Sequence, residues 1–361
     1  MIRKEGADSS VALFVDLGTP RTPPSTRFQG SKLKLVPWLE KRLSRLNFHS
    51  ALDVFGGTGT VSYLLKSLNK TVTYSDYLRC NQIIARAIVE NQSVTLDSSD
   101  ILYVLTKHSS VKYATFIADT FHDIYFTDKE NEWLDIVVQN IALMNDVYKQ
   151  AIAYFALFQS CISKRPYNLF HRKNLYVRTA DVKRTFGNKA TWDTPFEAMF
   201  RRFVHEANHA VFSSPQGCTS ICCDALESPV GFDLVYIDSP YIPLNGTGVD
   251  YHHFYHFLEG LVYYADWKYR IDHEKKHKPL LPVRSAWSDK TTIKDAFARL
   301  FKRHRNSILV VSYRSDGIPS ESEFVTMVKA VKSRVEVLHY GDYKYVLSKN
   351  DRSKELLIIG Q

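Results

Sequence analysis

At 361 residues and a formal net charge of +9, the chain can bury a large core and favours a polyanionic partner, although an incidentally basic soluble protein has the same charge balance. Its five cysteines form no CxxC pair and have no histidine-rich companion segment, which argues against a zinc site and favours small buried thiols in a reducing compartment. No apolar run of about eighteen residues occurs, and residues 11–15 are too short for a signal-peptide core, so we expect a cytoplasmic protein with no membrane segment and no metal.

Residues 1–26 form a Pro- and Thr-rich leader that we expect to be flexible and extended. The segment Phe28-Gln29-Gly30-Ser31-Lys32 then leads into an amphipathic helix predicted over 33–46. A Gly-Ser turn at a helix start exposes backbone amides, which together with Lys32 could hold an anionic group. An ordinary helix start accounts for the same residues equally well.

A predicted strand over 51–55 runs into the turn Gly56-Gly57-Thr58-Gly59, which is followed by a helix over 60–68. Glycines adopt positive φ and let the backbone approach a ligand closely. The next strand, over 72–76, ends at Asp76, 17 residues after Gly59. A glycine-rich turn with an acid at the end of the following strand is the layout for binding a nucleoside ribose. It fits a dinucleotide or S-adenosylmethionine, and GGTGTVS departs from the GxGxxG of the dehydrogenases.

From residue 97 to 216 the pattern becomes helical. Apolar residues at three- and four-residue spacing predict a structural helix through 133–163, and a second amphipathic helix covers 196–212. Between them, residues 164–189 contain eight Lys or Arg and one Asp, interleaved with aromatic residues. Basic groups meet phosphates and aromatic rings stack on bases, so this segment predicts DNA contact, with a plain solvated face as the alternative. The candidate DNA-binding residues are Lys164, Arg165, Tyr167, Asn168, Arg172, Lys173 and Arg178.

Two predicted strands follow this region. One covers 219–223 and ends at Asp224, and the other covers 234–237 and runs into Asp238-Ser239-Pro240-Tyr241. Proline cannot extend a central strand, so the second strand stops there and presents Asp238 and Tyr241 at its carboxyl end, where open α/β sheets bind ligands. An acid beside an aromatic ring suits a flat, hydrogen-bonding substrate such as a nucleobase. A strand leaving through a polar turn is the plainer explanation.

The remaining chain predicts helices over 251–264, 293–304 and 324–331, and strands over 307–312, 335–340, 343–347 and 355–359. The last two strands lie close enough in sequence to form an antiparallel pair at a sheet edge.

The order of these motifs resembles that of the DNA adenine-N6 methyltransferases of the Dam-like α group. The resemblance rests on FQGSK, DVFGGTG, YSDY, a helical insert, IDSPY, SYRSDGIPS and KELLI, and it extends over residues 27–359. It implies a Rossmann-like α/β fold with a mostly parallel, doubly wound sheet and an antiparallel edge hairpin. It also implies an S-adenosylmethionine-binding catalytic domain (27–96 and 217–361) and a helical DNA-recognition insert (97–216).

The resemblance also implies roles for individual residues. Phe28, Gly30 and Lys32 match the motif that contacts the cofactor, and Phe55, Gly57 and Gly59 match the loop around its methionine part. Asp76 matches the acid on the ribose hydroxyls, and Asp224 matches, more loosely, the acid that binds the cofactor's adenine amino group. Asp238, Ser239, Pro240 and Tyr241 match the catalytic DPPY tetrapeptide, in which Asp238 also borders the cofactor. Ser239 replaces the first proline of that motif, which puts the rigidity of the loop in doubt because serine does not fix φ.

We therefore expect a site-specific adenine-N6 methyltransferase that acts on double-stranded DNA. Asp238 and the Ser239 carbonyl would accept the two amino hydrogens of a flipped adenine, and Tyr241 would stack on the base. A restriction-modification partner and a monomer or weak dimer are further expectations. The alternatives are an exocyclic-amine methyltransferase acting on cytosine N4 or on RNA, and a catalytically inactive DNA-binding relative.

Overall fold

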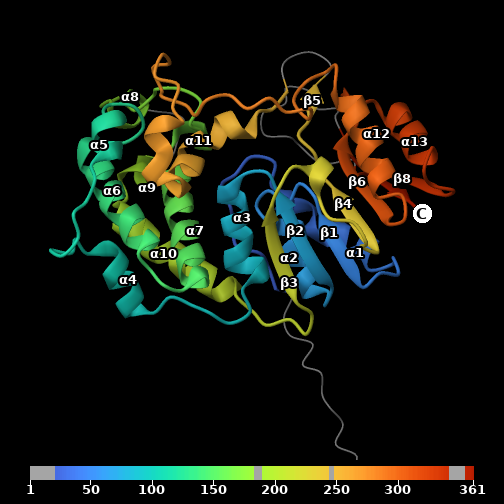
Figure 1. The fold of residues 1–361 in the computed structure, drawn as a ribbon, viewed down its shortest axis with the longest axis horizontal. Helices are drawn as coiled ribbons and strands as arrows, with labels where there is room; N and C mark the ends of the chain where they lie inside the picture. The colour runs from blue at the N-terminus through green and yellow to red at the C-terminus, as the bar shows by residue number, and fades with distance from the viewer. Residues whose placement is uncertain (1–20, 183–188, 244–247, 341–353) are drawn as a thin grey trace, which may run out of the picture.

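The computed structural model describes residues 21–182, 189–243, 248–340 and 354–361. Most of the predicted leader and the predicted strand over 343–347 lie outside these residues. Figure 1 shows two parts side by side, a twisted sheet with helices on both faces and a mainly helical part built from α4 to α10, which lie between residues 98 and 210. Among the described helices, none is long and apolar enough to cross a membrane.

The main sheet contains seven described strands in the order β3-β2-β1-β4-β6-β9-β8. The first five are parallel to one another, and β9 runs antiparallel to both of its neighbours. The doubly wound, mostly parallel sheet is confirmed, and so is an antiparallel edge. Among the described strands, β8 is the edge strand that pairs with β9. The sequence analysis predicted a pair between 355–359 and 343–347, and the second of these segments lies outside the described residues. The strands are β1 Ser50–Asp53, β2 Thr71–Asp76, β3 Cys218–Cys222, β4 Leu234–Ile237, β6 Ile308–Arg314, β8 Val335–Tyr340 and β9 Glu355–Gly360.

Alternating side chains of the central strands enter two separate cores, as the two-residue period of a strand requires. Leu234 and Tyr236 of β4 belong to the larger core, with α1 (Val36–Leu43), α2 (Thr60–Ser67) and α3 (Arg79–Ala85). Val235 and Ile237 belong to the second core, which α12 (Ile293–Arg303) and α13 (Glu321–Lys329) cover. Because both faces are covered, β4 is a continuous apolar run that is buried throughout.

The helical part shares the larger core with the sheet. The prediction of a single helix over 133–163 is wrong, because two helices, α6 and α7, occupy this range. Asp146 begins the second one, because its carboxylate accepts the amides of Tyr148 and Lys149 at 2.8 and 3.0 Å. Residues 151–163 of α7 are all buried, since this helix packs between α10 and α3. The helices of this part are α4 Ser98–Leu105, α5 Phe116–Thr120, α6 Asp128–Ala142, α7 Val147–Ser163, α8 Tyr176–Thr179, α9 Lys189–Asp193 and α10 Phe196–Ala210.

Several short elements complete the fold. A two-stranded sheet pairs β5 (Ile242–Pro243) with β7 (Gly317–Ile318). The helix α11 (Tyr251–Val262) connects the end of the β4 region to the helical part. The remaining short helices are η1 Lys32–Leu35, η2 Arg86–Glu90, η3 Pro166–Asn168, η4 Ala225–Glu227 and η5 Tyr264–Tyr269.

Candidate active site

A cavity of about 730 Å³, partly open to solvent, lies at the carboxyl ends of β1, β2 and β4. The segment before η1, the glycine turn after β1 and the first turns of α11 close its sides. The structure thus brings together residues that are far apart in the chain. Of the predicted site residues, those lining the cavity are Phe28, Gly30, Lys32, Phe55, Gly57, Asp76, Asp238 and Pro240.

Two predicted cofactor residues lie elsewhere. Gly59 is the N-cap of α2 with φ of 73°, so it shapes the turn while its neighbours line the cavity. Asp224 is half-buried after β3, and its carboxylate accepts the amide of Leu226 at 2.8 Å as the N-cap of η4. Asp224 is not among the described residues that line the cavity.

The glycine turn and Asp76 are joined by a hydrogen bond. The amide of Gly57, which has φ of 50°, donates to Asp76 Oδ2 at 2.9 Å, and the amide of Leu78 donates to Oδ1 at 2.8 Å. A Cβ at Gly56 would lie 2.1 Å from the Tyr74 ring, so this position has no room for a side chain. Burial raises the pKa of Asp76 to about 6, although these amide hydrogen bonds oppose the shift.

Asp53, the last residue of β1, lines the same cavity and was missed by sequence reasoning. Its side chain is buried; Oδ2 accepts the Ser62 hydroxyl at 2.7 Å, whereas Oδ1 has no partner among the described residues. Burial, with smaller contributions from Asp238 and Asp76, raises the pKa of Asp53 to about 7. Its place at the end of a strand just before the glycine turn is the signal that could have identified it. Three buried or nearly buried acids around one cavity suit a ligand that carries positive charge.

Asp238 belongs to a compact ionic cluster. Lys32 Nζ lies 3.1 Å from Asp238 Oδ1 and 2.6 Å from Glu355 Oε1, and the Tyr241 hydroxyl donates to Asp238 Oδ1 at 3.1 Å. Lys32 also contacts the Tyr241 hydroxyl directly. Burial raises the pKa of Asp238 to about 6; Lys32 opposes this shift and Glu355 adds to it. Glu355, the fully buried first residue of β9, is a second site residue that sequence reasoning missed.

The other members of the tetrapeptide lie around Asp238. Ser239 is buried, and its hydroxyl lies 3.4 Å from the Pro240 carbonyl oxygen, a long contact that constrains the loop only weakly. The Tyr241 ring is half-buried and packs edge-on against Tyr313, with 5.1 Å between ring centroids.

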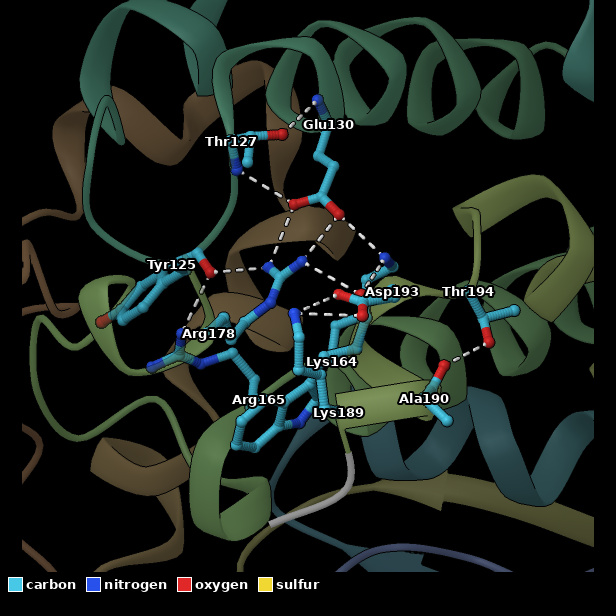
Figure 2. A network of polar contacts seen from close by, with 11 residues as sticks. Tyr125, Thr127, Glu130, Lys164, Arg165, Arg178, Lys189, Ala190, Asp193 and Thr194 are labelled. Carbon is cyan, nitrogen blue, oxygen red and sulfur yellow. Dashed lines mark hydrogen bonds and ion pairs between the residues drawn. The ribbon is translucent and has the colours of Figure 1, made fainter. Parts of the chain in front are cut away.

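Three of the predicted DNA-binding residues are buried, so their assignment to phosphate contact is corrected (Figure 2). Lys164 Nζ pairs with Glu130 at 2.8 Å, and the Arg178 guanidinium bonds both oxygens of Glu130 at 3.0 and 2.8 Å. Burial alone would raise the pKa of Glu130, but Arg178 and Lys164 hold it below its ordinary value. Arg165 donates to the carbonyl oxygens of Tyr125, Leu169 and Arg172, at 3.1, 3.2 and 3.3 Å. These three cations contact carboxylate and carbonyl oxygens of the helical part and stabilise it from inside.

The other four candidates lie on the loop that Arg165 holds. Tyr167 is 61% exposed, and both Tyr167 and Asn168 have left-handed backbones, with φ of 62° and 58°. Arg172 and Lys173 are exposed, and Lys173 pairs with the exposed Asp123 at 2.8 Å. The loop is fixed to α11, because the Phe170 amide donates to the Phe254 carbonyl oxygen at 3.0 Å.

Comparisons with known proteins show the family of the chain. Residues 28–305 match the family model of D12 class N6 adenine-specific DNA methyltransferases. The chain is 25% identical over 346 residues to the type II methyltransferase M2.HphI of Haemophilus parahaemolyticus, covering 93% of this chain and 97% of the relative. It is 24% identical to the type II methyltransferase M.NlaIII of Neisseria lactamica, covering 90% and 91% of the two chains. The type II methyltransferase M.FokI of Planomicrobium okeanokoites is 23% identical, with 84% of this chain matching 47% of that longer protein.

Proposed function

Because the chain belongs to the D12 class of N6 adenine-specific DNA methyltransferases, we propose that the described cavity binds S-adenosylmethionine and delivers its methyl group to an adenine held at Asp238. When bound, S-adenosylmethionine supplies an electrophilic methyl group on a positively charged sulfur. The observation that carries the proposal is the position of Asp238, which follows β4 at the edge of a cavity that also contains Asp53 and Asp76.

The residues around the cavity fit this cofactor. The unpartnered, buried Oδ1 of Asp53 would accept a hydrogen bond from the ammonium group of the methionine part. Asp76 would accept the ribose hydroxyls, exchanging its bond to the Gly57 amide for them. Phe28 and Phe55 provide apolar walls. The sulfonium and ammonium groups of this cofactor, which has a net positive charge, would also offset the repulsion among the acids of the cavity.

Asp238 and the Ser239 backbone carbonyl would accept the two hydrogens of the adenine amino group. Accepting both hydrogens localises the nitrogen lone pair toward the methyl carbon, which is preorganised electrostatic catalysis. When the methyl group of the bound cofactor is transferred to this nitrogen, the Asp238 carboxylate would take one amino proton and pass it to solvent. Lys32 and Tyr241 both contact Asp238 Oδ1, so we assign the contact with the substrate to Oδ2.

The target base would have to leave the duplex, because its amino nitrogen is inaccessible inside the stack. We propose that residues 97–216 form the DNA-recognition insert and that Tyr167, Asn168, Arg172 and Lys173 contact the duplex. Two consecutive left-handed residues that are not glycine indicate a loop held in a costly conformation, as is common at functional sites. The loop contacts α11 at Phe254, one helical turn from Tyr251, which lines the cavity.

The relatives also suggest a biological setting. Several of them are named as type II methyltransferases or as a modification methylase, so we propose that this protein protects DNA alongside a restriction endonuclease. A strain from which the gene is deleted would then contain DNA that the cognate endonuclease cleaves.

Single-turnover transfer of a labelled methyl group to duplex DNA tests the catalytic assignment. Asp238→Ala should abolish transfer while cofactor binding and thermal unfolding stay close to those of the wild type. The matched control is Asp295→Ala, which removes an exposed acid on α12 and should leave transfer unchanged. Wild-type transfer by a folded Asp238→Ala protein would contradict the assignment.

A further inference from the structure

A basic hairpin lies next to the predicted DNA-binding loop. Residues 270–281 turn back on themselves through an Ile271–Leu280 bridge, with the Asp272 amide donating to the Pro279 carbonyl oxygen at 2.8 Å. In Figure 1 it lies in the orange segment that follows α11. We call residues 270–281 the basic hairpin.

Residues 268–284 contain six Lys or Arg against two acids. One of the acids, Asp272, is mostly buried and pairs with Lys275 at 3.5 Å. The nearby imidazoles of His253 and His277 have lowered pKa values because of burial, so they add no charge at neutral pH. The exposed cations of this segment are Lys268, Arg270, Lys275, Lys276 and Arg284.

The side chain of Tyr125 contacts both the basic hairpin and the predicted DNA-binding loop, residues 167–173. The Tyr125 hydroxyl lies 2.7 Å from the Phe170 carbonyl oxygen of the loop and 2.8 Å from the His277 carbonyl oxygen of the hairpin. The His277 ring also packs edge-on against His253 of α11, with 5.2 Å between ring centroids. The loop and the hairpin therefore contact the same first turns of α11, which begin at the cavity.

We propose that the basic hairpin is a second DNA-contacting element, whose lysines bind backbone phosphates of the duplex that enters the cavity. This inference rests on the proposed function and extends it. Phosphate contacts carry no sequence information, but they set the register of a duplex on the protein and contribute much of its affinity. A second contact beside the loop would steady the duplex while one base leaves the stack.

The test is the salt dependence of binding to a short duplex. The double change Lys275→Gln and Lys276→Gln should lower the slope of log K against log salt by about 0.9 for each phosphate that the hairpin no longer neutralises. Lys302→Gln with Lys329→Gln makes the same charge change on α12 and α13, at the other end of Figure 1, and should leave the slope unchanged. Arg172→Gln with Lys173→Gln tests the loop itself. If the loop variant lowers the slope and the hairpin variant does not, the hairpin inference fails alone; if neither does, the proposed DNA face fails.

A second inference comes from the ionic cluster at Asp238. Glu355 is separated from Asp238 by 117 residues of chain, yet both carboxylates contact the same ammonium, Lys32 Nζ. The Ser312 hydroxyl donates to Glu355 Oε1 at 2.5 Å and fixes its orientation. Glu355 is not among the described residues that line the cavity, so it acts through Lys32.

We infer that Glu355 is a positioning residue: it holds the Lys32 ammonium against one oxygen of Asp238 and thereby directs the other oxygen toward the adenine amino group. The inference rests on the catalytic role proposed for Asp238. The charge of Glu355 also favours the protonated form of Asp238, which helps this carboxylate to take the amino proton after methyl transfer. The charged or titratable groups facing Asp238 are Lys32, Asp53, Tyr236, Tyr241 and Glu355.

Glu355→Gln keeps the shape of the side chain and removes its charge. The single-turnover rate should fall about 10- to 100-fold, because a small displacement of a catalytic group has effects of that size. The acid limb of the pH–rate profile should also move to lower pH, since Lys32 then acts on Asp238 without an opposing carboxylate. A purely structural role would change thermal unfolding and leave the profile in place.

Three companion variants keep this inference falsifiable. Glu336→Gln makes the same change on the exposed face of the neighbouring strand β8 and should change neither rate nor profile. Ser312→Ala removes the hydroxyl that orients Glu355 and should lower the rate by a smaller factor, which provides a test if Glu355→Gln does not fold. A wild-type rate and profile in Glu355→Gln, with Asp238→Ala inactive, would overturn the inference alone. Full activity in Asp238→Ala would contradict the proposed function, on which this inference rests.

Discussion

Replacing Asp53 with asparagine should stabilise the free protein and weaken cofactor binding. The pKa of Asp53 is raised from 3.8 to about 7, a difference of about 3 units. At about 1.4 kcal/mol per unit, the ionised side chain costs the folded state about 4 kcal/mol above pH 7. Asparagine still accepts the Ser62 hydroxyl, but it adds a buried amide with its own desolvation cost. The expected net stabilisation is therefore about 2–4 kcal/mol.

Thermal unfolding at two pH values measures this effect. For 361 residues the unfolding entropy near the midpoint is about 0.8 kcal/mol/K, so the Tm should rise by about 3–5 °C at pH 8.5. The folded state holds the Asp53 proton more tightly than the unfolded state, so its stability increases as pH falls from about 7 toward about 4. The advantage of Asp53→Asn should accordingly shrink by about half at pH 5.5.

Calorimetry with S-adenosylmethionine completes the test. The variant loses a charged acceptor for the ammonium group, so affinity should fall by about 1.5–3 kcal/mol, the usual cost of a charged hydrogen bond. An unchanged Tm, or an equal gain at both pH values, would refute the buried-charge explanation. Unchanged affinity would remove Asp53 from the cofactor site.

Three further predictions concern the same cavity. Asp76→Ala should weaken S-adenosylmethionine binding by about 1.5–3 kcal/mol in calorimetry, and unchanged affinity would exclude Asp76 as the ribose ligand. Tyr241→Ala should reduce turnover strongly, whereas Tyr241→Phe keeps the ring and should retain much of the wild-type turnover, because stacking on a base contributes about 1–3 kcal/mol. Normal turnover by both variants would refute the stacking role. Gly56→Ala places a Cβ 2.1 Å from the Tyr74 ring and should lower stability by about 1–3 kcal/mol in thermal unfolding, and a wild-type Tm would show that the ring moves aside freely.

The strand-end residues were predictable because carboxyl ends of parallel strands meet at one edge of a sheet. Asp76 ends β2, Asp238 directly follows β4, and both line the cavity. The same rule could not identify Glu355, because β9 runs antiparallel to the five parallel strands. Its first residue, and not its last, therefore lies at the edge where those strands end. Asp53 was not recognised as a strand-end residue, because the apolar pattern continues through Val54 and Phe55 and predicts a strand that extends beyond the described end of β1.

Charge alone could not separate the exposed cations from the buried ones. Lys164 and Arg178 meet Glu130, which lies more than 30 residues earlier in the chain, and only the folded structure brings these charges together. The boundary between α6 and α7 was missed for a local reason. The apolar spacing continues across it, while the cap at Asp146 depends on a single side chain.

The most direct test of the central claim is the identity of the methylated base. Purified protein, duplex DNA and S-adenosylmethionine are incubated, and the DNA is digested to nucleosides and analysed by mass spectrometry, with Asp238→Ala as the control. We expect N6-methyladenine at a fixed sequence with the wild type and none with the variant. N4-methylcytosine as the product, or N6-methyladenine formed equally by Asp238→Ala, would contradict the proposed chemistry.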